Sequence, residues 1–114
     1  MSNDQAEEYT LKRLSEYNGE DESKPILLGI NHNVYDVTPG AKFYGKGGSY
    51  SIFAGRDCTH NFAIGSVNKD DLPTAESDPV DLKTYSEDQQ QAARNWEERL
   101  SQKYSVVGRL VKAE

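Results

Sequence analysis

The chain has 114 residues, which is enough for one domain with one modest core. Its 13 Lys and Arg against 19 Asp and Glu leave a formal net charge of −6, which argues against nucleic-acid binding because that needs a basic face. The single cysteine, Cys58, cannot form an internal disulfide and fits a reducing compartment. No apolar run approaches the ~20 residues of a membrane-spanning helix, and the acidic N-terminus lacks a signal-peptide core. We therefore expect a soluble, cytoplasmic domain that carries no transmembrane segment.

The predicted elements begin after residues 1–8, which we expect to form a disordered acidic tail, so that the domain itself spans residues 9–114. Thr10 is a typical N-cap for a short helix that Gly19 ends. Two short strands are predicted next, at residues 26–30 and 34–37. The intervening Asn31-His32-Asn33 suits a tight turn, because asparagine tolerates a positive φ.

Residues 40–55 hold five of the nine glycines and four aromatic residues, which predicts a loop whose backbone passes close to something flat or bulky. Short helices are expected at residues 50–53 and 59–64, followed by a loop over 65–85. Ser86 and Gln89 have capping-box spacing and open a helix over 86–101, and a last strand covers 104–111. This order predicts an α+β fold in which the helices are grouped apart from a small sheet.

The sequence contains no convincing catalytic motif, so we expect that the protein is not an enzyme. The stretch from Gly40 to Lys46 resembles a phosphate-binding loop, but Gly47 stands where Ser or Thr must hold magnesium. Cys58 and His60 are two residues apart and face different sides of a helix, which favours a packed, inert cysteine. One cysteine and two distant histidines do not supply a zinc site.

Two of the seven tyrosines stand apart, because Tyr44 and Tyr50 lie in the glycine-rich loop near Lys42, Lys46 and Arg56. A phenolate is a hard anionic ligand that suits ferric iron, and tyrosine is a known protein ligand of heme iron. A nearby cation lowers the pKa of a phenol and favours the anion. Packing in a core or at its rim is the commoner use of tyrosine, so the residues alone leave both interpretations open.

Two long motifs resemble those of the cytochrome b5-like fold and, within it, the membrane-associated progesterone receptor (MAPR) family. The first is Asp36-Val37-Thr38-Pro39-Gly40, Phe43-Tyr44-Gly45, Tyr50 and Phe53-Ala54-Gly55-Arg56-Asp57; the second is Trp96-Glu97, Lys103-Tyr104 and Val107-Gly108-Arg109-Leu110. The resemblance covers residues 9–111. Cytochrome b5 itself holds heme with two histidines, whereas this chain has none between residues 33 and 59 and has Ser66 or Val67 in the second histidine position.

The resemblance implies a cytochrome b5-like heme/steroid-binding fold, a small mixed sheet with short helices around a pocket. It implies a tyrosinate axial ligand at Tyr50 for a ferric, five-coordinate heme b, with Tyr44 as a second tyrosine that hydrogen-bonds nearby. Lys103 and Tyr104 correspond to the pair at the heme edge and propionates. Asp57 corresponds to an aspartate near the pocket, and a role at a helix N-terminus is an equal alternative.

The function implied by the resemblance is a non-catalytic heme-binding module, also able to bind a steroid or sterol, that regulates cytochrome P-450 monooxygenases or sterol metabolism. Stacked hemes would join two copies in a homodimer, and the domain would lie in the cytoplasm or peripherally at the endoplasmic reticulum membrane. Three alternatives remain: a heme-free steroid or sterol carrier, an interaction domain using the acidic residues 68–98, and a redox protein. The missing histidines count against the last.

Overall fold

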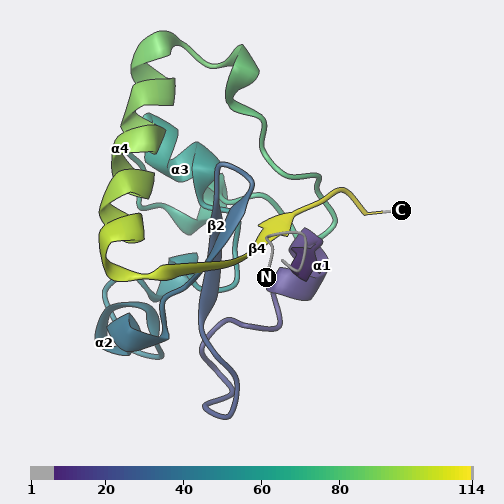
Figure 1. The fold of residues 1–114 in the computed structure, drawn as a ribbon, viewed down its shortest axis with the longest axis vertical. Helices are drawn as coiled ribbons and strands as arrows, with labels where there is room; N and C mark the ends of the chain where they lie inside the picture. The colour runs from purple at the N-terminus through teal and green to yellow at the C-terminus, as the bar shows by residue number, and fades with distance from the viewer. Residues whose placement is uncertain (1–6, 114) are drawn as a thin grey trace, which may run out of the picture.

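The computed structural model describes residues 7–113 and has a four-stranded mixed sheet with short helices on both of its faces (Figure 1). The strands are β1 (Glu7–Tyr9), β2 (Leu27–Ile30), β3 (Asn33–Asp36) and β4 (Ser105–Leu110). Their spatial order is β1-β4-β3-β2, with β1 parallel to β4 and the other neighbours antiparallel. The α+β class predicted from the sequence is confirmed.

The longest helix, α4, packs against α3 on one side of the sheet, while the short α1 lies on the other side (Figure 1). The α-helices are α1 (Leu11–Leu14), α2 (Ala41–Tyr44), α3 (Thr59–Ile64) and α4 (Glu87–Lys103), and 3-10 turns are η2 (Thr38–Gly40), η3 (Ser51–Phe53), η4 (Lys69–Asp71) and η5 (Leu82–Thr84). Over residues 7–113, none of the helices is both long and apolar enough to cross a membrane.

Local sequence signals account for several of these elements. Thr10 caps α1 by accepting a hydrogen bond from the Arg13 amide, and Ser86 and Gln89 form the predicted capping box at the start of α4. The β2–β3 hairpin turns at Asn31 and His32, whose φ angles are 51° and 69°. These angles form a tight turn in which Ile30 pairs with Asn33. Asn33, which the sequence analysis placed in the turn, is therefore the first residue of β3.

The predicted boundary between tail and domain is wrong at residues 7 and 8. Glu7 and Glu8 lie in β1 and pair with Gly108 and Arg109 of β4, while residues 1–6 are outside the described part of the chain. Glu7 bonds to Arg13 at 2.7 Å, and Glu8 bonds to Arg109 at 2.8 Å. Backbone pairing with β4 and the burial of Tyr9 make these acidic residues part of the sheet, and the exposed ion pairs add little.

The sheet divides the core into two parts. Leu27 and Val34 pack with α1, whereas Leu28, Ile30 and Tyr35 face the helices on the other side. This division follows from the alternation of side chains along a strand. The larger part of the core continues into the aromatic residues of α2, α3 and α4, so it places those residues beside one another.

Glu97 fixes the position of α4 relative to the hairpin. Its carboxylate accepts hydrogen bonds from the side-chain amides of Asn31 (3.1 Å) and Asn33 (2.6 Å) and from the Tyr35 hydroxyl (2.9 Å). Three donors on one carboxylate give directional attachment that apolar packing alone lacks. The neighbouring Trp96 is thereby held over α3.

Candidate functional site

A row of aromatic side chains crosses from the end of α4 through the glycine-rich loop and α3 and back to the middle of α4. We call it the aromatic row; its members in spatial order are Tyr104, Tyr44, Tyr50, Phe53, Phe62 and Trp96. Successive ring centroids are 6.2, 6.0, 5.9, 5.1 and 4.8 Å apart. These spacings are typical of interacting aromatic pairs, and the contacts range from stacked to edge-on, with interplanar angles between 15° and 83°. Tyr44, Phe53 and Phe62 are buried, so the row is a packed part of the core that is partly accessible at Tyr50, Trp96 and Tyr104.

A cavity of about 90 Å³ opens beside this row, and we call it the aromatic cavity. Tyr50, Phe53, Phe62 and Trp96 of the row line it, together with Asn61, Gly65, Ser66 and Val67. Two large apolar side chains are exposed nearby: Val67 is 71% exposed, and Phe43, 41% exposed, has its ring 6.4 Å from that of Tyr50. An apolar cavity with exposed apolar side chains at its margin is typical of a ligand-binding surface.

Glycines place Tyr50 at the edge of this cavity. Gly47 has a φ of +83°, and a Cβ on Gly48 would collide with the backbone of Phe43. The tight turn that these residues permit lets the Tyr50 amide donate a hydrogen bond to the Phe43 carbonyl at 2.8 Å. The half-buried Tyr50 ring therefore lines the cavity and stacks on Phe53.

Tyr44 and Tyr50 have different environments. Tyr44 is only 6% exposed, and burial, together with the neighbouring phenols, raises its pKa to about 12. Tyr44 is therefore a protonated hydrogen-bond donor at neutral pH, and Tyr50 is the phenol of the pair that lines the cavity. The separate heme roles expected for the two residues from the resemblance stay predictions.

The structure brings Tyr104 to the site and leaves Lys103 at its periphery. The Tyr104 ring packs edge-on against Tyr44, and its hydroxyl lies against the Cα of Gly40, where a Cβ would collide with it. Gly40 is thus required by the close approach of a side chain from a distant part of the chain. Lys103 is exposed at the end of α4, next to Tyr104.

Asp57 has a structural environment away from the aromatic cavity. It is 1% exposed; one carboxylate oxygen accepts from the Thr59 amide (3.1 Å) and hydroxyl (2.6 Å), and the other from the Val80 amide (2.8 Å). Burial raises its pKa, although these hydrogen bonds oppose the effect. Asp57 therefore joins the start of α3 to the loop before α4, which corresponds to the alternative of a role at a helix N-terminus.

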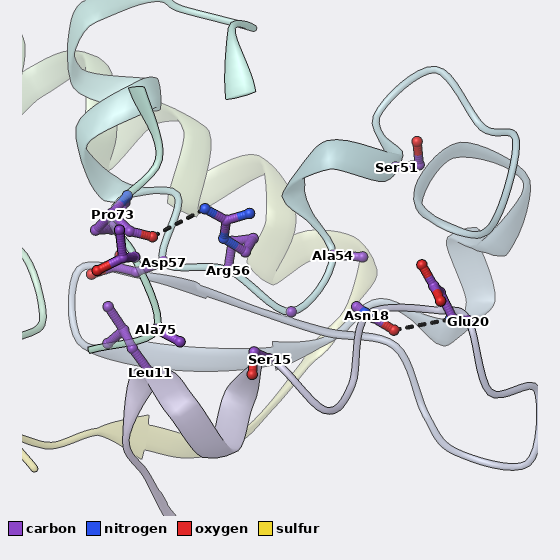
Figure 2. Close-up of a pocket in the computed structure, with 12 residues that line it drawn as sticks. Leu11, Ser15, Asn18, Glu20, Ser51, Ala54, Arg56, Asp57, Pro73 and Ala75 are labelled. Carbon is purple, nitrogen blue, oxygen red and sulfur yellow. Dashed lines mark hydrogen bonds between the residues drawn. The ribbon is translucent and has the colours of Figure 1, made fainter. Parts of the chain in front are cut away.

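Asp57 also borders a larger, polar cavity of about 460 Å³ on the α1 side of the structure (Figure 2). Figure 2 shows Arg56 reaching across it to the Pro73 carbonyl, a hydrogen bond of 3.1 Å. Arg56 and Asp57 there already have protein partners, and the lining lacks the aromatic side chains of the other cavity. The aromatic cavity is the stronger candidate.

Sequence reasoning missed Asn61, which is fully buried in α3 and lines the aromatic cavity. Its side-chain amide donates to the Asn68 carbonyl at 3.1 Å, and its Oδ1 has no hydrogen-bond partner in the described structure. One signal could have indicated that Asn61 is buried. It directly precedes the apolar segment Phe62-Ala63-Ile64 in a helix that packs through that segment. Ser66 and Val67, noted in the second histidine position, line the same cavity.

The raised pKa of Tyr44 predicts a loss of stability in alkali. In the unfolded chain this phenol titrates near its ordinary value of 10.0, whereas in the folded chain it titrates near 12. The contribution of the protonated Tyr44 to the free energy of unfolding is therefore fully present below about pH 10. It is lost as the pH rises from about 10 to 12. Urea unfolding measures the free energy of unfolding of wild type and of Tyr44→Phe at pH 8 and at pH 11. Between these two pH values the free energy of unfolding should fall less in the variant than in wild type. Equal falls in the two proteins would contradict the assignment.

Comparison with known proteins identifies the fold and the family. Residues 10–111 match the family described as "Cytochrome b5-like Heme/Steroid binding domain". A solved structure of a hypothetical Arabidopsis thaliana protein with a cytochrome b5 like fold superposes with a TM-score of 0.82 at 40% identity, covering 97% of this chain and 96% of that one. The fold therefore defines a cytochrome b5-like domain.

Named relatives narrow the class further. The chain is 43% identical to "Probable steroid-binding protein 3" of Arabidopsis thaliana, over 91% of this chain and 98% of that protein. It is 41% identical to human "Membrane-associated progesterone receptor component 2", over 92% of this chain but 45% of that protein. It is 38% identical to "Cytochrome P450 regulator dap1" of Schizosaccharomyces pombe, over 91% of this chain and 63% of that protein. The chain belongs to the cytochrome b5-like heme/steroid-binding family, in its membrane-associated progesterone receptor branch.

Proposed function

We propose that the chain is a non-catalytic heme-binding module in which the phenolate of Tyr50 is the single protein ligand of a ferric heme b. The observation that carries this proposal is the pairing of two neighbouring tyrosines with different environments. Tyr50 is half-buried at an apolar cavity, while Tyr44 beside it is held protonated by burial. Tyr50 thus presents its phenol to the cavity, where an iron would bind its oxygen, and Tyr44 beside it can donate a hydrogen bond.

The residues present suit such a group. The aromatic row is partly accessible at Tyr50, Trp96 and Tyr104, and the exposed Phe43 and Val67 add apolar surface beside it. Lys103 supplies a cation beside Tyr104 that can pair with carboxylates such as heme propionates. The cavity is much smaller than the roughly 300 Å³ or more of an enclosing ligand pocket, so a large flat ligand would be only partly covered.

These residues favour regulation over electron transfer. An anionic oxygen ligand stabilises ferric iron, so a heme bound here would supply an iron of low reduction potential. The Schizosaccharomyces pombe relative is named as a regulator of cytochrome P450, which supports a P450 monooxygenase as partner. Partial coverage leaves a flat face for pairing two copies through heme, and the name of the human relative supports peripheral association with a membrane.

The test is a hemin titration of the purified protein, followed by Soret absorbance and by electron paramagnetic resonance. Wild type should give a saturable Soret band and a high-spin ferric signal, and Tyr50→Phe should weaken both by tenfold or more in affinity, because phenylalanine removes the ligand atom while keeping the ring. Tyr17→Phe is a matched control, since Tyr17 is also half-buried but packs in the core part on the α1 side. Equal hemin affinity in wild type and Tyr50→Phe would refute the assignment of the ligand.

A second candidate function is a heme-free carrier of a steroid or sterol. The observation that favours it is the mainly apolar lining of the aromatic cavity, with the exposed Val67 at its margin. Family membership and the Arabidopsis relative named as a steroid-binding protein support the same ligand class. Binding of a steroid without hemin, with no Soret band in the hemin titration, would favour this second function.

A further inference from the structure

The polar cavity on the α1 side contains a positive charge that lacks an acidic partner. Arg56 lines this cavity and is half-buried, and none of the ion pairs found within residues 7–113 includes it. The neighbouring Asp57 is 1% exposed, and its carboxylate accepts hydrogen bonds from Thr59 and Val80 instead. A charged group that has lost part of its water is usually paired with an opposite charge, so the position of Arg56 suits an anionic ligand.

The hydrogen bond of Arg56 to the Pro73 carbonyl leaves most of the guanidinium group available. The N–H groups of a guanidinium form two forks of parallel donors, and the two forks share the terminal nitrogen Nη2. The Pro73 carbonyl is 3.1 Å from Nη2 and takes one of its two hydrogens. The other fork therefore keeps both of its donors. Figure 2 shows the Arg56 side chain among the lining residues, with its second terminal nitrogen directed away from Pro73.

The size and lining of the polar cavity suit a small organic molecule. Its volume of about 460 Å³ lies within the roughly 300–1,000 Å³ of small-molecule sites, whereas the aromatic cavity has only about 90 Å³. Leu11, Ala54 and Ala75 contribute apolar surface to the lining. Ser51 and Asn18 also line it, and neither the Ser51 hydroxyl nor the Asn18 side-chain nitrogen donates to a group in the described part of the chain. The cavity thus combines a cation, two further donors and room for hydrocarbon.

We propose that the polar cavity binds a small aliphatic carboxylate, whose two oxygens accept from the available fork of Arg56 and whose hydrocarbon lies against Leu11 and Ala75. Arg56 is the one basic residue of the described lining, so it neutralises a monoanion but only half of a phosphate dianion. Glu20, exposed at the margin, repels any anion and weakens binding, although solvent and salt screen its charge. This inference goes beyond the proposed function and does not involve Tyr50.

The test compares an anion with a neutral molecule of the same shape. Isotope-labelled, heme-free protein is titrated with hexanoate and with hexanamide, and nuclear magnetic resonance follows the backbone amides and the Arg56 side-chain Nε–H. Wild type should bind hexanoate about tenfold more tightly than hexanamide, because only the anion forms charge-assisted hydrogen bonds with the guanidinium. The largest shifts should lie at Arg56, Ser51 and Ala75, which line the polar cavity, and the Trp96 indole should shift little.

Variants assign the preference to Arg56. Arg56→Gln should bind hexanoate about tenfold more weakly and lose the advantage over hexanamide, and Arg56→Lys should fall between it and wild type because lysine keeps the charge but lacks the fork. Arg94→Gln makes the same change in net charge at an exposed position on α4 and should bind as wild type does. Glu20→Gln should bind hexanoate about two- to threefold more tightly at low salt. Circular dichroism checks that each variant is folded.

The outcomes separate this inference from the proposed function. Equal binding of hexanoate and hexanamide by wild type, binding of neither, or shifts centred on Trp96 would overturn the inference, and none of these results depends on a variant. A preference for hexanoate that persists in a folded Arg56→Gln would overturn it as well. Failure of the heme proposal appears elsewhere, in equal hemin affinities of wild type and Tyr50→Phe.

Discussion

Replacing Phe62 by alanine is expected to lower the free energy of unfolding by about 3–5 kcal/mol. Phe62 is 4% exposed, stacks on Trp96 at 4.8 Å and meets Phe53 edge-on at 5.1 Å. It is thus the link through which α3 packs on α4 and on the glycine-rich loop. Its removal leaves unfilled space that joins the aromatic cavity, which Phe62 lines.

Urea unfolding monitored by circular dichroism measures this effect, with Trp96 emission as a second probe. Emission should shift to longer wavelength in the folded variant, because the indole loses its stacked partner and gains water. Val67→Ala is the matched control: Val67 lines the same cavity but is 71% exposed, so its removal should change stability by no more than about 0.5 kcal/mol. A loss below about 1 kcal/mol in Phe62→Ala would show that the row does not hold the helices together.

Replacing Asp57 by alanine is expected to lower the free energy of unfolding by about 2–4 kcal/mol. The carboxylate accepts three hydrogen bonds, two from Thr59 and one from Val80, and the backbone amides of both residues would lose their acceptor. The burial that raises the pKa of Asp57 offsets part of the gain from these bonds in the native protein. The expected loss of unfolding free energy is therefore smaller than the sum of three charge-assisted hydrogen bonds.

Two further variants sharpen this measurement. Asp57→Asn should lower the free energy of unfolding less than Asp57→Ala does. The amide oxygen of asparagine can still accept from Thr59, although its nitrogen then faces the Val80 donor. Asp78→Ala, at an exposed acidic residue of the same loop, should be nearly neutral. If Asp57→Ala unfolds at the wild-type urea concentration and instead loses hemin affinity, the residue belongs to the binding site and the structural role is wrong.

Much of the fold could be predicted because its signals are local. Thr10, the turn at Asn31 and His32, and the Ser86–Gln89 capping box each act within a few residues, so one sequence displays them. The cytochrome b5-like fold and its family came from motifs at matching spacing, and the comparisons confirm both. The heme roles of Tyr50, Tyr44, Lys103 and Tyr104 stay predictions.

The remaining features depend on residues that meet only in the folded chain. Strand β1 pairs with β4, where Arg109 lies opposite Glu8 and 101 positions away, so its acidic sequence alone resembles a tail. Helix α2 has four residues between glycines, which is too short to show a helical period. Asn61 looked like an ordinary polar residue in α3, and its unmet Oδ1 could be seen only with the surrounding side chains in place.

The parallel pairing of β1 with β4 bears on how the domain responds to force. Glu7 is opposite Gly108 and Tyr9 is opposite Leu110, and the Val111 amide extends the ladder to the Tyr9 carbonyl at 2.9 Å. When the two ends of the chain are pulled apart, parallel terminal strands slide past each other, so the hydrogen bonds between them are loaded together in shear. In an antiparallel terminal pair the same force would load the hydrogen bonds one after another, starting from one end of the ladder. A domain tethered at one end and pulled at the other would thus resist extension through this short ladder first.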